Sequence, residues 1–155
     1  MIIRAAREAD TRGFVELARQ VEHWFGPMAA EPGFHAALTR HIGRGTALAA
    51  TTDTGEELLG GLLLTARPPA CHVRWLVIAE HARGTGIGRA LLDDAMRRLV
   101  TTPRTVEVVT FGADHPGAAA SGARIFYERL GFAPAEAAPR GPEGGSRQVY
   151  RKPLT

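Results

Sequence analysis

The sequence predicts an α/β protein, a single domain over residues 1–155 with a mixed central sheet and elements in the order β-α-α-β-β-β-α-β-α-β-β. Three observations lead to this class. Short β-prone runs alternate with segments whose apolar residues recur at helical spacing. The 155 residues, 45% of them hydrophobic, are enough for one substantial core. Near the middle, an extended apolar run leads into a glycine-rich turn and then into a helical pattern.

The first part of the chain predicts one strand and two helices. Residues 1–6 are apolar and β-prone. Residues 8–24 are predicted to form one long helix, because apolar residues recur at helical spacing there, and Gly26-Pro27 ends it. A second helix is expected over residues 33–42, where glycines follow the last periodic residue.

The next part predicts three strands. Residues 46–51 and 58–65 read as a β-hairpin around a turn at residues 53–55. Pro68-Pro69 then breaks the chain, and the apolar run 73–78 is the strand that enters the glycine-rich turn.

The rest of the chain completes the α/β pattern. A helix is predicted after the glycine-rich turn, because apolar residues repeat every four positions from Ile87 to Leu99. The remaining segments follow in this order: a strand at 105–111, a connection at 112–122, a helix ending at Leu130, a strand beginning at Phe132, a loop at 139–145 and a last strand at 148–152.

The glycine-rich turn predicts an anion site. A turn between a strand and a helix points several backbone N–H groups, and the positive end of the helix dipole, at one place. Gly84, Gly86 and Gly88 lack a Cβ, so the backbone can approach a bulky phosphate closely. Arg83 and Arg89 flank the turn with charge that suits a diphosphate.

Two common phosphate-binding loops do not fit this turn. A P-loop closes with Gly-Lys-Ser/Thr, whereas Gly88 is followed by Arg89 and Ala90. A dinucleotide fingerprint needs G-x-G-x-x-G, and the glycines at 84, 86 and 88 do not have that spacing.

The turn does match Arg-x-x-Gly-x-Gly, and a second block, residues 123–132, carries Tyr127 and closes with Gly131-Phe132. Together they resemble the GCN5-related N-acetyltransferase (GNAT) superfamily, whose fold splays two parallel strands around acetyl-coenzyme A. The resemblance implies direct attack of a primary amine on acetyl-coenzyme A in a ternary complex. A small amine is slightly favoured over a protein as the acceptor.

The resemblance also implies roles for particular residues. Tyr127 would be the general acid beside the coenzyme sulfur. The expected coenzyme-binding residues are Leu76, Val77 and Ile78 through their backbone, the loop residues Arg83, Gly84, Thr85, Gly86, Ile87, Gly88 and Arg89, and Tyr127 itself. The family often has an asparagine seven positions before the tyrosine that bonds the pantetheine arm; this chain has Ala120 there, so that polar contact is expected to be lost or supplied elsewhere.

The general base and the acceptor site are less defined by the sequence. The run 73–78 holds no glutamate, and the weak candidates for the base are Glu22, His23, His72 and Glu107. Trp24 and Phe25 are candidates for an aromatic wall of the substrate pocket, or for an anchor of the helix junction. The histidines show no metal-ligand spacing, so no metal is expected.

Composition narrows the partners. The formal net charge is +3, carried by scattered arginines without interleaved aromatic residues, so a nucleic-acid partner is not expected. No run is apolar and long enough for a membrane, and no signal pattern precedes the first strand, which predicts a cytoplasmic protein. Cys71 is the only cysteine and is expected in the core. A homodimer is compatible with the sequence.

The sequence is compatible with three functions. The first is an acetyl-coenzyme A-dependent N-acetyltransferase. The second is a non-catalytic acyl-coenzyme A-binding sensor or regulatory module, for which the missing base and Ala120 leave room. The third, a nucleic-acid-binding domain, rests on basicity alone and predicts binding that depends steeply on salt.

Overall fold

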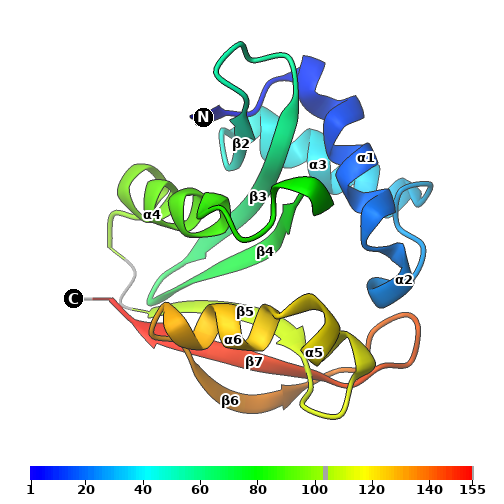
Figure 1. Ribbon diagram of the computed structural model, residues 1–155. Helices are drawn as coiled ribbons and strands as arrows, with labels where there is room; N and C mark the ends of the chain where they lie inside the picture. Colours follow the sequence, from blue (N-terminus) through cyan, green and yellow to red (C-terminus); the bar gives the residue numbers. More distant parts are fainter. Residues whose placement is uncertain (103–104, 155) are drawn as a thin grey trace.

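The computed structural model describes residues 1–102 and 105–154, which form one seven-stranded sheet flanked by helices (Figure 1). The strands lie in the order β1-β2-β3-β4-β5-β7-β6, and every described pair of neighbours is antiparallel except β4 and β5. The strands are β1 (Ile2–Ala5), β2 (Ala47–Thr51), β3 (Leu58–Arg67), β4 (Ala70–Ile78), β5 (Thr105–Phe111), β6 (Ala133–Ala138) and β7 (Arg147–Pro153). The α/β class and the mixed sheet are confirmed.

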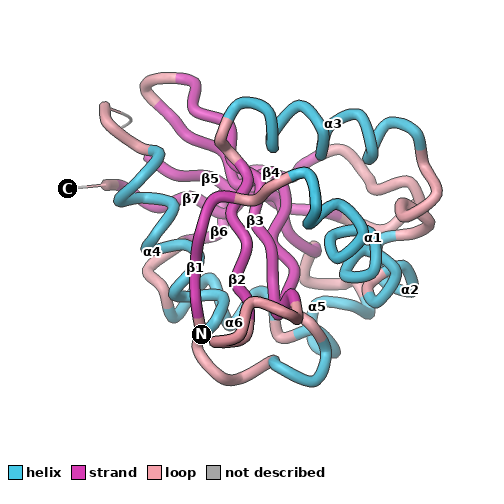
Figure 2. The backbone as a smooth tube through the Cα atoms, turned by 90° about the horizontal axis from the view of Figure 1, so that it is seen from above, coloured by secondary structure: helices cyan, strands magenta, loops and turns pink. Residues whose placement is uncertain are grey.

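Helices cover both faces of this sheet. Figure 2 shows α4 on one side of the strands and α1 and α3 on the other. The helices are η1 (Glu8–Asp10), α1 (Thr11–Gln20), α2 (Glu22–Phe25), α3 (Pro32–Arg44), η2 (Glu80–Ala82), α4 (Ile87–Leu99), α5 (Pro116–Ser121) and α6 (Ala123–Arg129). Among these described helices, none combines the length and the apolar character needed to cross a bilayer.

Strand β2 shows how the sheet separates two cores. All five of its residues are buried, and they alternate between the faces. Leu48 and Ala50 belong to the larger core, which includes residues of α4 and β5. Ala47 and Ala49 join Phe14 of α1 in the smaller core. The sheet is therefore packed on both sides at this strand, which explains its continuous run of small and apolar residues.

The expected helix over residues 8–24 is wrong in its continuity. The structure divides it into η1, α1 and α2, because Val21 takes φ −114° and ψ 5°, outside the helical region. Val21 is nevertheless buried and turns the chain so that α2 packs toward β5. The apolar spacing across the break suits a helix, so the sequence pattern did not reveal it.

The expected connection over residues 112–122 also needs correction, because it contains helix α5. His115 caps this helix by accepting a hydrogen bond from the Gly117 N–H at 2.8 Å, and Pro116 occupies the first turn. Gly122 has φ 69° and separates α5 from α6. Alanine- and glycine-rich sequence obscured a helix whose ends are nonetheless marked by a cap and a glycine.

A β-bulge in β4 opens the centre of the sheet. Leu63 pairs with Trp75 and Leu64 with Val73, so Arg74 has no partner on β3. A bulge bends the strand that carries it. The parallel pairing of β4 with β5 ends at the same place, at Val73 and Val108, although the two strands continue to Ile78 and Phe111. The strands therefore splay apart, as expected.

Candidate active site

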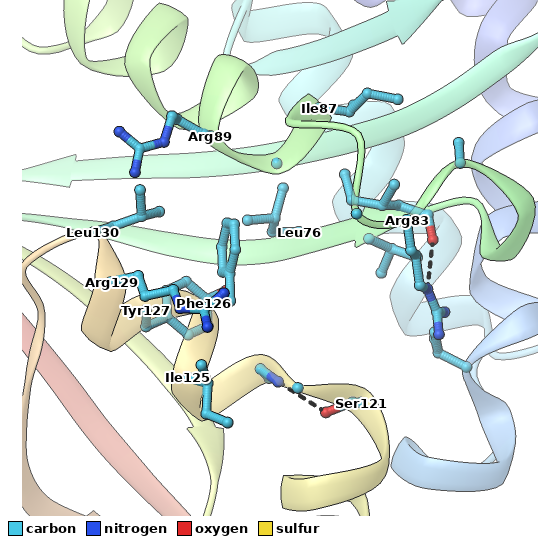
Figure 3. Close-up of a pocket in the computed structure, with 18 of the residues that line it drawn as sticks. Leu76, Arg83, Ile87, Arg89, Ser121, Ile125, Phe126, Tyr127, Arg129 and Leu130 are labelled. Carbon is cyan, nitrogen blue, oxygen red and sulfur yellow. Dashed lines mark hydrogen bonds between the residues drawn. The ribbon is translucent and has the colours of Figure 1, made fainter.

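A cavity of about 610 Å³ lies at the splayed ends of β4 and β5 (Figure 3). Its walls come from α2, the end of β4, the glycine-rich turn, the start of α4, and α6. The lining residues are Val21, Trp24, Phe25, Leu76, Val77, Ile78, Ala82, Arg83, Gly84, Gly86, Ile87, Gly88, Arg89, Phe111, Ser121, Gly122, Ala123, Ile125, Phe126, Tyr127, Arg129 and Leu130. The structure thus brings together most of the residues expected to bind coenzyme.

The charged side chains that line this cavity are positive. Arg83, Arg89 and Arg129 contribute to the walls, and the described residues of the lining include no aspartate, glutamate or histidine. Figure 3 shows Arg89 on the α4 wall and Arg129 on the opposing α6 wall. A concave surface of this kind attracts anions, because its guanidinium groups have no carboxylate beside them in the lining. Arg129 was not anticipated from the sequence.

The glycine-rich turn exposes its backbone to the cavity. Gly84 and Gly86 have φ of 76° and 88°, the left-handed region that other residues adopt at a cost. Gly86 is the N-cap of α4 and offers no side chain to the first amides of the helix. The first helical hydrogen bond runs from Ala90 N–H to Gly86 O at 3.0 Å, so the amides of residues 87–89 have no helical acceptor.

Two further loop residues brace the turn. A Cβ on Gly88 would lie 2.8 Å from Cζ of Phe126, so glycine lets α4 approach α6 closely at the mouth of the cavity. Thr85 is outside the lining, and its hydroxyl donates a hydrogen bond to Ala82 O at 2.5 Å. Its side chain therefore fixes the shape of the turn.

The backbone of β4 beyond the bulge offers polar groups to the gap. Ala79 N–H donates to Leu59 O at 2.8 Å, so the groups of Ala79 face β3. In an antiparallel strand the N–H and C=O groups of successive residues point to opposite edges. Val77, two residues before Ala79, therefore also directs its N–H and C=O at β3. Those of Leu76 and Ile78 face the gap. Of the three residues expected to bind coenzyme through their backbone, Val77 is therefore the one whose N–H and C=O point away from the gap.

Arg83 bridges the turn and α2. Its Nε donates to Ile78 O at 3.3 Å (Figure 3), and its guanidinium lies 5.0 Å from the centroid of the Trp24 ring. Such a contact is a cation–π interaction. Arg83 thus occupies one end of the cavity, where it covers a carbonyl oxygen that would otherwise face the gap.

An aromatic wall closes the α2 end of the cavity. Phe25 stacks on Phe111 with ring centroids 4.7 Å apart, and Trp24 meets Phe111 edge-on at 6.5 Å. Trp24 and Phe25, the expected substrate wall, therefore lie at the cavity. Phe111 was missed as a site residue, because only the splay of β5 from β4 exposes its ring to α2.

Tyr127 is almost wholly buried, with 6% of its surface exposed, yet it lines the cavity. Its ring packs edge-on against Phe126 and Phe132, at centroid distances of 5.0 and 5.4 Å. Its hydroxyl makes no hydrogen bond with the described residues. Burial raises the pKa of this phenol above its ordinary value of 10, so the hydroxyl stays protonated and is available as a donor.

The structure separates the four candidate bases from the cavity lining. Glu22 accepts a hydrogen bond from Met28 N–H at 3.1 Å, and the His23 ring lies 4.2 Å from the Trp24 ring at a 45° tilt. Both sit on α2, near the cavity but outside its walls.

His72 and Glu107 lie in the paired part of β4 and β5, before the strands splay. They face each other in register, with His72 Nδ1 3.5 Å from Glu107 Oε1, and Glu107 also pairs with Arg151. Burial lowers the pKa of His72. The parallel register holds both side chains at the closed part of the strands, outside the cavity lining.

The position that departs from the family pattern also lies outside the cavity lining. Ala120 is exposed on α5. The neighbouring Ser121 does line the cavity, but its hydroxyl donates to Gly117 O at 2.5 Å. The same hydroxyl accepts from Ala123 N–H at 3.2 Å, the bond drawn in Figure 3. The described residues include no group of three or more histidine, cysteine, aspartate or glutamate side chains arranged to hold a metal ion.

Comparisons with known proteins agree with this geometry. The family model of the acetyltransferase (GNAT) domain matches residues 40–134. This chain belongs to the GNAT acetyltransferase family. A search of the curated proteins found no match.

Similar solved structures share the fold over almost the whole chain. A GCN5-related N-acetyltransferase from Kribbella flavida is 21% identical, with TM-score 0.73 and coverage of 99% of this chain and 97% of that one. A ribosomal-protein-alanine N-acetyltransferase from Brucella melitensis is 20% identical, with TM-score 0.74 and coverage of 99% and 100%. A PaiA N-acetyltransferase from Thermoplasma acidophilum, in complex with coenzyme A, is 17% identical, with TM-score 0.72 and coverage of 99% and 98%.

Proposed function

We propose that this protein transfers the acetyl group of acetyl-coenzyme A to a primary amine by direct attack in a ternary complex. The observation that carries the proposal is the cavity between the splayed strands. Its charged lining residues are all arginines, and free helix amides and two left-handed glycines open onto it. This combination suits a long ligand with a diphosphate at one end.

The residues present fit coenzyme A. A Cβ on Gly84 or Gly86 would meet no atom within 4 Å, so the loop backbone is open to a phosphate. The amides of residues 87–89, with Arg89, would hold the diphosphate. The pantetheine arm would follow β4, where the polar backbone groups of Leu76 and Ile78 face the gap. Because Arg83 covers Ile78 O, it would have to release that carbonyl as the arm enters.

Acetyl-coenzyme A supplies a thioester as the acetyl donor. The Leu76 N–H, which faces the gap, is suited to donate to the carbonyl oxygen as negative charge develops there. Removal of one such donor typically costs 100- to 1000-fold in turnover. Val77 cannot replace it, because its N–H is directed at β3.

Tyr127 is suited to the leaving sulfur. Its hydroxyl is protonated, has no hydrogen-bond partner among the described residues and is held on a buried ring at the cavity. A simple thiol has a pKa of about 8.5, below that of this phenol. Tyr127 would therefore stabilise the departing thiolate by donating a hydrogen bond to it, and not by transferring its proton completely.

The acceptor amine must be neutral when it attacks. Over residues 1–102 and 105–154 the lining holds no carboxylate or imidazole, so water is the proposed proton acceptor. A lining without such a base also suits the second candidate function, a non-catalytic acyl-coenzyme A sensor. The two differ in turnover, since a sensor binds acetyl-coenzyme A without releasing thiol in the presence of amines.

A thermal-shift titration with acetyl-coenzyme A tests the proposal, with NAD and ATP as controls. Ligand at one hundred times its dissociation constant stabilises by about 2.7 kcal/mol. For a domain of this size the melting temperature should rise by roughly 5–10 °C. Arg89→Gln should reduce the shift, and Arg40→Gln, an equal charge change at an exposed position of α3, should not. No shift at saturating acetyl-coenzyme A would refute the proposal, and a shift without thiol release would favour the sensor.

A further inference from the structure

Exposed arginines gather on the face of the sheet that is turned away from α4. Helix α3 packs on this face against β2 and β3 (Figure 2). Leu63 of β3 belongs to the smaller core on this side, and side chains alternate along a strand, so Arg67 points to the same face. Leu64 N–H donates to Thr46 O at 3.0 Å, which places the end of α3 beside the middle of β3. Arg67 therefore lies beyond the end of the helix.

Strand β4 adds a second arginine to this face. His72 pairs with Thr65, two positions before Arg67, so the His72 side chain also points to this face. Burial lowers the pKa of His72, the positive charge of Arg74 lowers it further, and that of Arg67 acts in the same direction. The guanidinium groups of Arg67 and Arg74 are therefore both near this imidazole.

The last two turns of α3 bring two more arginines. Arg40 and Arg44 are about one helical turn apart, and both are exposed. Between them, the buried His41 shares a hydrogen bond with Thr46 Oγ1 through Nδ1, at 2.7 Å. Burial lowers the pKa of His41, and three positive charges lower it further, those of Arg40, Arg44 and Arg74. Because Arg74 acts on both histidines, the arginines of α3 and of the β3–β4 hairpin belong to one surface.

This basic surface, which we define as Arg40, Arg44, Arg67 and Arg74, has little compensating negative charge. All four side chains are exposed, and none of their guanidinium groups has an ion pair or a hydrogen bond with a described side chain. Glu107 is the carboxylate that acts on His72, and it already pairs with Arg151. The surface therefore presents its positive charge to solvent.

The chemistry of the basic surface fits a chain of phosphates. Guanidinium groups bind phosphate oxygens through paired hydrogen bonds. A second copy of this chain would oppose like charges. A membrane surface calls for apolar side chains that insert, and the large hydrophobic side chains exposed in the described part of the chain lie elsewhere, at Met1, Ile2, Val109 and Ile125. Residues 40–46 and 65–74 contain no aromatic residue on which unpaired bases could stack, which favours a duplex backbone over a single strand.

We propose that the basic surface binds the phosphate backbone of duplex nucleic acid without reading its sequence. This interaction goes beyond acetyl transfer and leaves the cavity accessible, because none of the described residues 32–46 and 65–74 lines the cavity. The sequence indicates no nucleic-acid partner, because its arginines are scattered along the chain. The fold brings four of them together.

The test is fluorescence anisotropy of a labelled 20-base-pair DNA duplex of mixed sequence, titrated with the 155-residue protein at several salt concentrations. Each contacted phosphate contributes about −0.9 to the slope of log K against log salt, so four contacts predict a slope of about −3.6. The double variant Arg67→Gln/Arg74→Gln should bind more weakly, with a slope shallower by about 2. Arg12→Gln/Arg97→Gln is the matched control: it removes the same net charge from exposed positions of α1 and α4, and it should keep the wild-type slope.

The outcomes separate this proposal from the proposed function. The thermal shift with acetyl-coenzyme A reports on the cavity and should be the same in Arg67→Gln/Arg74→Gln as in wild type. Coenzyme A should not displace the duplex, and displacement would place the DNA in the cavity and overturn the proposal. It is also overturned if wild type does not bind the duplex at low salt, if the control variant loses as much affinity as Arg67→Gln/Arg74→Gln, or if a poly-glutamate peptide or phosphatidylserine vesicles bind this surface and the duplex does not.

Discussion

Replacing Tyr127 by phenylalanine removes one oxygen atom and leaves the ring packing intact. The Tyr127 hydroxyl makes no hydrogen bond with the described residues, and the ring contacts to Phe126 and Phe132 persist in phenylalanine. The free energy of unfolding should therefore stay within about 0.5 kcal/mol of wild type. Turnover should fall by about 10²- to 10⁴-fold, the usual loss for a missing proton or hydrogen-bond donor. At about 1.4 kcal/mol per tenfold, that is roughly 3–5 kcal/mol of barrier.

Tyr150→Phe is the matched control. It removes the same hydroxyl oxygen, but it is expected to lower stability and to leave turnover unchanged. The Tyr150 hydroxyl donates to Glu128 Oε2 at 2.9 Å and lies outside the cavity lining. Its loss should cost about 1 kcal/mol of stability. The melting temperature should then fall by roughly 2–4 °C. Turnover should stay close to that of wild type.

The assay combines chemical denaturation with thiol release from acetyl-coenzyme A, using an amine that the wild type acetylates. The coenzyme-induced thermal shift is measured alongside and should be the same in Tyr127→Phe as in wild type. Wild-type turnover in Tyr127→Phe would refute the role of this hydroxyl. A loss of stability as large as that of Tyr150→Phe would show instead that the phenol is structural.

Two further predictions concern stability. Asp10 accepts hydrogen bonds from Arg4 at 2.6 and 2.9 Å, which hold its pKa below the ordinary 3.8, so this stabilisation is present above about pH 4 and is lost as pH falls. Asp10→Asn should cost about 2 kcal/mol at pH 7. The difference should shrink at pH 3 in urea titrations, and an equal loss at both values would contradict the ion pair. Burial raises the pKa of Cys71 from 9.0 to about 11, so stability should be full below pH 9 and decrease as pH rises toward 11. An aromatic disulfide reagent at pH 8 should label Cys71 only after unfolding, and rapid labelling of the folded protein would contradict its burial.

The glycine-rich turn was predictable because its causes are local. Gly84 and Gly86 adopt the left-handed conformation that the glycine pattern indicates, and α4 begins at Ile87, as expected. Tyr127 likewise falls on a helix, because the block that carries it begins after Gly122 and ends before Gly131. Backbone dihedrals and helix ends depend on residues a few positions apart, which the sequence displays directly.

The positions of the candidate bases relative to the cavity could not be predicted from the sequence, because they depend on strand pairing. His72 and Glu107 have suitable side chains, and the parallel register does bring them together, but it does so in the closed part of the strands. Glu143 and His115, which the sequence leaves 28 positions apart, meet only because the β6–β7 loop folds onto the start of α5. Their proximity depends on the placement of β7 between β5 and β6.

By itself, the sequence determined the α/β class, the turn that exposes amide groups, and the family to which the chain belongs. Only the tertiary structure decided which groups face the cavity. The bulge at Arg74 sets which backbone amides of β4 point into the gap and where the strands part, and the splay lets Phe111 meet Phe25. Strand register is a property of two chain segments at once, stabilised by contacts distant in sequence, so no single stretch of residues encodes it.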